Sequence, residues 1–321
     1  MKAIKKISLA VVFNLLAQLC MSLQGCTSGA QISPEQTAKS EPPQIVSGET
    51  IWRGENHGIE IRWTTVDLFA KSGPTVERIW GPLVQKGFED FAAVLAGGPS
   101  GKKDRAVNCS YERRFKILSI VGTLVSFEDQ YSDDCGGAHP SADTRFTTVD
   151  LSKPDNLLYA RHEDTPMMNV DLAKTGKIIK LTDYFPEQDV LQALLADHII
   201  QKALAGLNRQ TSPRTLAELP ELFAANDYAL GDLDFELRPD FLTRFAFHHI
   251  EGDRVAIRLG LPPHSGANRT QYQQLGLLLP IPESLKHDLA LATSQRQGFL
   301  MKDAEQVGGQ RTTTFNLSTE K

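Results

Sequence analysis

A short glycine-containing loop places one histidine among several carboxylates. Its residues are Gly136, Gly137, Ala138, His139 and Pro140, and its acidic neighbours in the sequence are Asp133, Asp134 and Asp143. Carboxylates near an imidazole tune its protonation, so His139 is a candidate for acid–base chemistry or for binding. Two glycines that permit positive φ angles and a following proline also describe a constrained turn. The sequence therefore leaves two interpretations open, a binding loop and a scaffold turn.

The chain shows no stronger catalytic pattern elsewhere. It has neither a Gly-x-Ser-x-Gly elbow nor a His-Glu-x-x-His helix, and the spacing within Gly97–Lys103 does not fit a phosphate-binding loop. His248 and His249 are adjacent in a predicted strand, where successive side chains point to opposite faces, so we do not expect them to hold one ion together. We expect no catalytic residues, no metal and no cofactor, and a non-enzymatic protein is favoured over an enzyme.

The first 25 residues have the pattern of an export signal that ends before a lipid-modified cysteine. Three lysines and an apolar stretch lead into the closing residues Leu23-Gln24-Gly25-Cys26. In bacterial lipoprotein leaders, a leucine three residues before the cysteine and a small residue directly before it mark the cleavage site. The thiol of that cysteine receives a diacylglyceryl group. We therefore expect Cys26 to carry the lipid.

This leader predicts that the protein is located in the cell envelope, where it is lipid-anchored and extracytoplasmic. Thr27 after the cysteine is compatible with an outer membrane, facing the periplasm, if the source cell has one. The alternatives are an ordinary signal peptide with a chance cysteine, and a membrane-spanning anchor. Polar residues such as Asn14 and Gln18 interrupt the roughly 20 apolar residues that a spanning helix needs.

Cys109 and Cys135 are the two cysteines that follow Cys26 in the mature protein. In an oxidising compartment such a pair favours a disulfide over two free thiols, which remain the alternative together with a metal site. Neither cysteine has the close Cys or His spacing that a zinc site uses. A predicted hairpin of Asn108–Leu118 and Thr123–Tyr131 brings the two cysteines to the same end, which makes the bridge geometrically sensible.

Charge limits the classes of partner. Loss of the three leader lysines takes the formal net charge from −5 for the whole chain to −8 for the mature part. A surface of that sign repels nucleic acid and speeds encounter with a basic protein. We therefore expect contact with the membrane through the N-terminal lipid, no nucleic-acid partner, and a partner such as cell-wall glycan or a basic secreted protein.

Hydrophobic periodicity predicts a series of strands with a few helices. The predicted strands are Ile59–Trp63, the hairpin above, Arg145–Val149, Leu157–Arg161, Met168–Leu172, Phe235–Leu237, Arg244–His249, Val255–Leu259 and Leu275–Leu279. The predicted helices begin near Pro82 and span Glu187–Leu204 and Pro282–Leu291. The expected division is a signal peptide at 1–25, a flexible tether at 26–48, α+β subdomains at 49–186 and 187–291, and a disordered tail at 292–321.

Two motifs in order carry a resemblance to a known family. The segment from Leu124-Val125-Ser126-Phe127 through Tyr131 to the loop Gly136–Pro140, followed by Thr175–Phe185, resembles an extracytoplasmic domain. That domain is shared by the lysozyme-sensing anti-sigma factor RsiV and the non-catalytic part of the peptidoglycan deacetylase PdaC. The resemblance covers roughly residues 50 to 290. It implies an α+β body in which antiparallel sheet with hairpins packs against two main helices, in two intimately joined subdomains.

Three functions stay open at this stage. The favoured one is a membrane-anchored, non-enzymatic envelope lipoprotein that recognises cell-wall material or a secreted protein such as a lysozyme. The alternatives are a hydrolase of cell-wall glycan or peptide that uses His139 and its acidic neighbours, and a structural or assembly factor of the envelope. A concave pocket at His139 would favour chemistry, and a flat rim would favour binding.

Overall fold

The computed structural model describes residues 48–96, 109–135, 141–153, 179–206, 213–224, 237–261 and 273–318. Within them the chain forms three antiparallel sheets with helices on them, so the α+β prediction is confirmed. The leader, Cys26, the tether and the loop Gly136–Pro140 lie outside the described residues, as do the predicted strands Leu157–Arg161 and Met168–Leu172.

The first sheet is a four-stranded meander. Its strands are β1 (Thr50–Asn56), β2 (Ile59–Thr64), β3 (Leu68–Ser72) and β4 (Thr75–Arg78), each paired with the next. Alternation in β2 buries Ile61 and Trp63 completely and leaves Arg62 on the other face, as the sequence predicted. This sheet therefore presents an apolar face to the rest of the body.

The second sheet carries the predicted hairpin. It consists of β5 (Ser110–Val121), β6 (Leu124–Asp134), β7 (Ser141–Asp150) and β11 (Thr313–Ser318), in the order β11-β5-β6-β7. The β5–β6 turn contains Gly122 at φ 58°, a left-handed conformation that favours glycine. The hairpin prediction and the strand predicted at Arg145–Val149 are confirmed.

The C-terminal segment is folded, so the predicted disordered tail at 292–321 is wrong for residues 292–318. It contains the short helix α6 (Ala304–Gly308) and strand β11, which pairs antiparallel with β5. The segment is polar, but Phe315 packs edge-on against Phe115 with ring centroids 5.9 Å apart. Thr313 is fully buried, and its hydroxyl accepts a hydrogen bond from Trp63 Nε1. Backbone pairing with a distant strand, which composition does not reveal, orders this segment.

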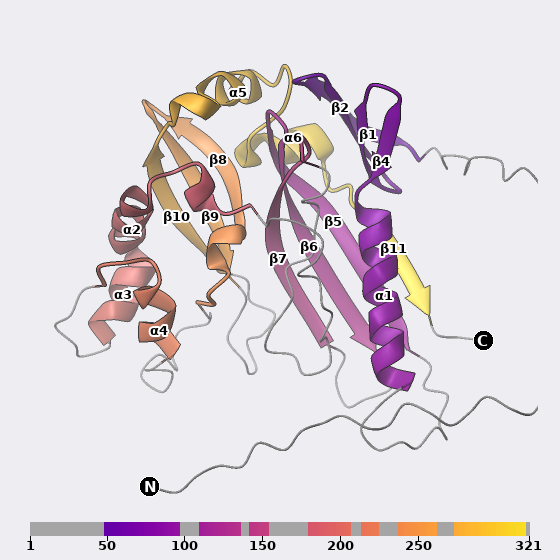
Figure 1. Ribbon diagram of the computed structural model, residues 1–321, viewed down its shortest axis with the longest axis horizontal. Coiled ribbons are helices and arrows are strands. Elements are labelled where there is room, and N and C mark those ends of the chain that lie inside the picture. The colour runs from indigo at the N-terminus through magenta and orange to yellow at the C-terminus, as the bar shows by residue number, and fades with distance from the viewer. Residues whose placement is uncertain are drawn as a thin grey trace, which may run out of the picture. The chain divides into compact units, whose positions relative to one another are not determined.

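Helix α1 (Trp80–Ala96) packs on the second sheet, as Figure 1 shows. The indole of Trp80 stacks on Phe115 with centroids 4.8 Å apart and meets Phe127 edge-on. The buried carboxylate of Asp67 accepts hydrogen bonds from the backbone N–H groups of Trp80 and Gly81. It thereby satisfies donors that a helix start leaves unpaired, and it fixes where α1 begins.

The third sheet has the order β10-β9-β8 and carries most of the remaining helices. Its strands are β8 (Phe245–Glu251), β9 (Arg254–Leu261) and β10 (Gln273–Pro280), and the helices are α2 (Glu187–Ala196), α3 (His198–Gly206), α4 (Glu218–Ala224) and α5 (Glu283–Thr293). The strands and the helix predicted in 244–291 are confirmed. The single helix predicted over Glu187–Leu204 is wrong, because the chain breaks at Asp197.

Asp197 ends one helix and starts the next. Its backbone is extended, with ψ 133°, and its carboxylate Oδ1 accepts hydrogen bonds from the N–H groups of Ile199 and Ile200 at the start of α3. The other oxygen, Oδ2, accepts from the N–H of Gly276 on β10, 2.9 Å away. Aspartate favours such capping positions over helix interiors. The apolar periodicity continues across the break, so it concealed the break.

Small polar side chains join the second and third sheets. The hydroxyl of Ser119 accepts a hydrogen bond from Phe247 N, and that of Thr148 donates to the carbonyl oxygen of Phe245.

One large hydrophobic core lies between the third sheet and α2–α5, and another lies among the first sheet, α1 and the second sheet. Both belong to one compact unit, Val46–Lys321.

Candidate functional site

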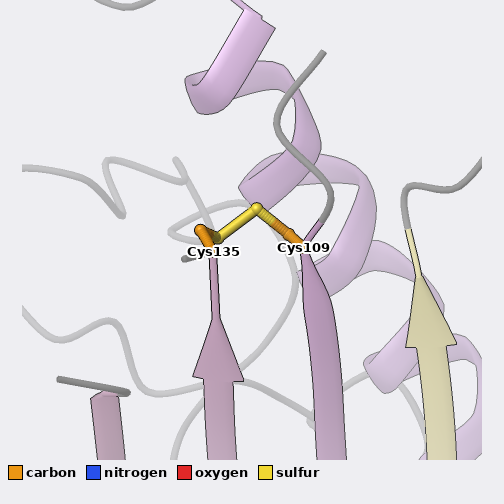
Figure 2. The surroundings of a disulfide bond; sticks show 2 residues. All are labelled: Cys109 and Cys135. Atoms are coloured by element: carbon orange, nitrogen blue, oxygen red, sulfur yellow. A yellow bond between two sulfur atoms is a disulfide. The ribbon is translucent and has the colours of Figure 1, made fainter. Parts of the chain in front are cut away.

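The predicted disulfide between Cys109 and Cys135 is confirmed. It joins the start of β5 to the end of β6, with Cα atoms 4.2 Å apart (Figure 2). Ser110 pairs with Asp134 in the adjoining register, so the bridge closes the open end of the hairpin. Cys109 is buried, which protects the bridge from solvent on that side.

The candidate loop Gly136–Pro140 lies between two described anchors. Cys135 precedes it and is held by the disulfide, while Ser141 follows it as the first residue of β7. The last register pair of the β6–β7 ladder is Asp133 with Ser141. The residues on either side of the loop are therefore held at the end of β6 and the start of the neighbouring strand β7.

The acids named with His139 divide between the two faces of the second sheet. Asp143 pairs with Tyr131, and Asp133 lies two residues beyond Tyr131, so these two acids share a face with that tyrosine. Asp134 lies on the opposite face. The structure therefore places Asp133 and Asp143 on one face of the sheet, near the end of β6 and the start of β7, and Asp134 on the other face.

A buried ion cluster crosses the same sheet, and the sequence analysis missed it. Asp129 on β6 accepts hydrogen bonds from Arg113 on β5, with Nε–Oδ1 at 2.8 Å, and Arg145 on β7 lies 3.4 Å from its other oxygen. All three residues are less than a tenth exposed. Two guanidinium groups around one carboxylate tie three strands together under α1.

Regular pairing of the predicted hairpin about Gly122 would have put Lys116 opposite Asp129 and Arg113 on the other face. The bulge between Ile117 and Ser119, which the sequence does not reveal, puts Phe115 opposite Asp129 and Arg113 on the same face.

His248 and His249 lie side by side, so the prediction that they point apart is wrong. The β8–β9 register runs from Phe247 opposite Ile257 to His249 opposite Ala256, which leaves His248 as an extra residue in a β-bulge. A bulge interrupts the alternation of side chains and re-aims them. The two Nδ1 atoms are 2.7 Å apart, with the ring centroids 4.9 Å apart.

The pKa of the His248 imidazole is lowered from its ordinary value. Burial is the largest cause, and the positive charges of Arg258 and Lys302 and the neighbouring His249 act in the same direction. Asp303 acts against them. The His248 ring is therefore neutral at neutral pH, with one ring nitrogen available as an acceptor.

His57 contacts helix α5. Its Nε2 lies 3.0 Å from both carboxylate oxygens of Asp288 on α5. The same carboxylate lies against Gly122 in the β5–β6 turn. A side chain at this position would collide with it, since an added Cβ atom would lie 2.3 Å from Asp288 Oδ2. Asp288 thus connects two hairpin turns to one helix, and no catalytic nucleophile is hydrogen-bonded to His57 among the described residues.

No group of three or more His, Cys, Asp or Glu side chains among the described residues could hold a metal ion. In the same part of the chain no helix is long and apolar enough to cross a bilayer.

Comparison of the chain with protein-family models, with curated proteins and with solved structures finds no match. The leader, the disulfide-bonded hairpin and the loop that follows Cys135 are the features of the chain that bear on its function.

Proposed function

We propose that this chain is a lipid-anchored envelope protein whose folded body binds a partner without catalysing a reaction. The partner is cell-wall material or a basic secreted protein such as a lysozyme. Anchoring takes place through a diacylglyceryl group on Cys26, and the body lies outside the cytoplasm. In a cell with an outer membrane, it faces the periplasm.

The Cys109–Cys135 disulfide is the observation that carries the extracytoplasmic part of the proposal. Disulfides form and persist in oxidising compartments and are rare where thiols are kept reduced. A leader that exports the chain and a bridge that needs export to form are independent features of the sequence. Both indicate an extracytoplasmic location.

The same disulfide supports a binding role for the loop Gly136–Pro140. Binding costs entropy when a loop must be ordered, so a loop whose ends are already fixed binds with a smaller penalty. Asp133 and Asp143 at this end of the sheet, together with the net negative charge of the mature body, favour a basic partner through faster encounter. These features favour recognition over turnover.

The test measures binding and turnover on the same samples. Full-length protein is incubated with insoluble peptidoglycan and, separately, with immobilised lysozyme; the bound fraction and the release of soluble glycan fragments are then measured. We expect saturable binding to one of the two without fragment release. Fragment release that disappears in His139→Ala would show a hydrolase instead, and binding to neither would overturn the proposed partners.

His139→Ala and Gly137→Val separate a binding loop from a scaffold turn. If the loop binds the partner, His139→Ala weakens capture while the melting temperature stays nearly unchanged. Gly137→Val is the companion variant: if that glycine has a positive φ, the change destabilises the protein by more than about 1 kcal/mol. A large loss of melting temperature in His139→Ala, with capture falling only in proportion to folded protein, would assign the loop to the scaffold.

A further inference from the structure

Three arginines form a row across the outer face of the first sheet. The register places Arg53 opposite Arg62, Arg62 opposite Phe69, and Phe69 opposite Arg78, so these four side chains lie on one face. The alternate residues of β2 and β3 face the hydrophobic core on the other side of the sheet. Neighbouring strands lie about 4.8 Å apart, so the row spans about 14 Å.

Phe69 holds Arg62 in place without using its hydrogen-bond donors. The Cζ atom of Arg62 lies 4.8 Å from the centre of the ring, and Phe69 is only 4% exposed although it lies on the outer face. A guanidinium stacked on a ring keeps its N–H groups in its own plane, where they can bind an oxyanion. Phosphate is an oxyanion that a guanidinium binds with two parallel hydrogen bonds.

The other two arginines are paired but remain accessible. Arg53 lies 3.0 Å from Glu60, and Arg78 lies 2.8 Å from the buried carboxylate of Asp67. The side chains of Arg53 and Arg78 are nevertheless 63% and 58% exposed. Solvent screens such pairs, so both guanidinium groups can also contact a ligand at the surface.

The outer face as a whole has more positive than negative side chains. Its charged residues in the four strands are Arg53, Arg62, Lys71 and Arg78, against Glu55 and Glu60. Even when the buried Asp67 is included, the face stays positive, whereas the mature protein is strongly negative. An anionic surface therefore attracts this face while it repels the protein as a whole.

The arginine row lies close to the point where the chain enters the folded body. Arg53 is the fourth residue of β1, and β1 begins two residues after Gly48. Gly48 follows Cys26 by 22 residues, which span at most about 80 Å even when fully extended. A lipid on Cys26 therefore keeps the row at a high local concentration beside the membrane, where a weak attraction suffices for binding.

We propose that the arginine row binds the phosphate groups of anionic phospholipids and thereby orients the anchored body on the membrane. This inference rests on the lipid anchor of the proposed function. The first sheet then faces the membrane, and the more negative parts of the body face away from it. Because the arginines lie at the surface, salt weakens the attraction.

The test measures energy transfer from a dye on the folded body to an acceptor lipid, with the lipidated mature protein anchored in vesicles. The dye is attached at Thr75→Cys, the exposed first residue of β4. We expect more transfer in vesicles of phosphatidylglycerol and phosphatidylcholine than in vesicles of phosphatidylcholine alone. Salt at about 1 M should remove this rise. A dye at Gln201→Cys, exposed on α3, should show a smaller rise.

Arg53→Gln/Arg62→Gln tests the row itself and leaves the pair of Arg78 with Asp67 intact. Each arginine should contribute about fivefold to the ratio of membrane-bound to unbound bodies, so this variant should lose most of the rise. The control Arg254→Gln/Arg296→Gln removes the same charge at two exposed positions outside the first sheet and should keep the rise. Thermal unfolding checks that each variant folds.

The inference is overturned if transfer is the same in both kinds of vesicle, which is also the result expected of a face that binds an acidic protein. It is equally overturned if folded Arg53→Gln/Arg62→Gln keeps the full rise. Failure of the lipid anchor gives a different result, because the protein then sediments with neither kind of vesicle.

Discussion

At the residue scale, Asp129 is the carboxylate that two buried arginines share. It pairs with Arg113 and Arg145, and all three side chains are almost fully buried. Asp129→Asn would leave two buried guanidinium groups without their shared carboxylate. Breaking such a buried ion pair costs about 3 kcal/mol or more, and we expect chemical denaturation to show a loss of this size.

A surface ion pair on β5 supplies the matched control for this variant. Glu112 and Arg114 lie 2.7 Å apart but are 35% and 52% exposed, so solvent screens their attraction. Glu112→Gln should change the free energy of unfolding by less than about 0.5 kcal/mol. Similar losses for Asp129→Asn and Glu112→Gln would contradict a stabilising role for the buried cluster.

Asp150 makes a pH-dependent contribution to stability. Burial raises its pKa, but hydrogen bonds from Ser152 and Thr123 outweigh burial, and the net pKa lies below the ordinary value of 3.8. A carboxyl with a lowered folded-state pKa stabilises the fold above its unfolded pKa, and this stabilisation is lost as the pH falls through the folded value.

Ser152→Ala tests this linkage. We expect it to destabilise the protein by about 1 kcal/mol at neutral pH, because the carboxylate loses a donor. The difference from the parent should shrink as the pH falls below the ordinary carboxyl pKa of 3.8 and through the lower folded-state pKa, because the carboxyl then takes up its proton. Ser72→Ala, at an exposed position on β3, should show no such trend. A difference that does not depend on pH would contradict the assignment.

At the element scale, Asp197 decides that two helices form where one was expected. Asp197→Ala removes the cap of α3 and leaves the N–H of Gly276 without its acceptor. We expect a loss of about 2 kcal/mol in the free energy of unfolding. Gln201→Ala, at an exposed position on α3, is the control and should be nearly neutral. Equal effects of the two variants would mean that the cap contributes nothing.

Helices and strands with one buried face could be predicted from the sequence. The bulge, the helix break and the polar strand that interrupt this pattern could not. Alternation predicts β2 because Ile61 and Trp63 face a core while Arg62 does not. The bulge at His248 and the break at Asp197 depend on partners on β9 and β10, which alternation along one segment cannot reveal. β11 is a further exception, because its polar sequence is ordered by pairing with β5, about 200 residues earlier.

Some contacts of the candidate site could also be predicted from the sequence, and others could not. The disulfide could be predicted because Cys109 and Cys135 flank a hairpin whose turn is visible in the sequence. The contact of His57 with Asp288 could not, because 231 residues separate them and only the packing of α5 brings them together. Contacts between distant segments therefore needed the structure. Across the β5–β6 turn the disulfide could be predicted, but the Arg113–Asp129 pair could not, because a bulge shifts the register between them.

At the scale of the whole molecule, the disulfide closes a loop with a sequence separation of 26 residues. In the chain-entropy model such a bridge stabilises the fold by about 3 kcal/mol, because it restricts the unfolded chain. Cys109→Ser/Cys135→Ser should lower stability by that amount. Intact mass of natively purified protein, with and without reductant, reports the bridge directly. Two thiols that alkylate without reduction would show that the bridge does not form in the cell.

We propose that a lipid on Cys26 holds the folded body in the envelope. Metabolic labelling with a radioactive fatty acid tests it most directly. We expect label in the parent protein and in Cys20→Ser, which alters a leader cysteine that is removed on cleavage. Cys26→Ser should carry no label and remain as an unprocessed or mislocalised precursor. Labelling of Cys26→Ser equal to that of the parent would contradict the claim.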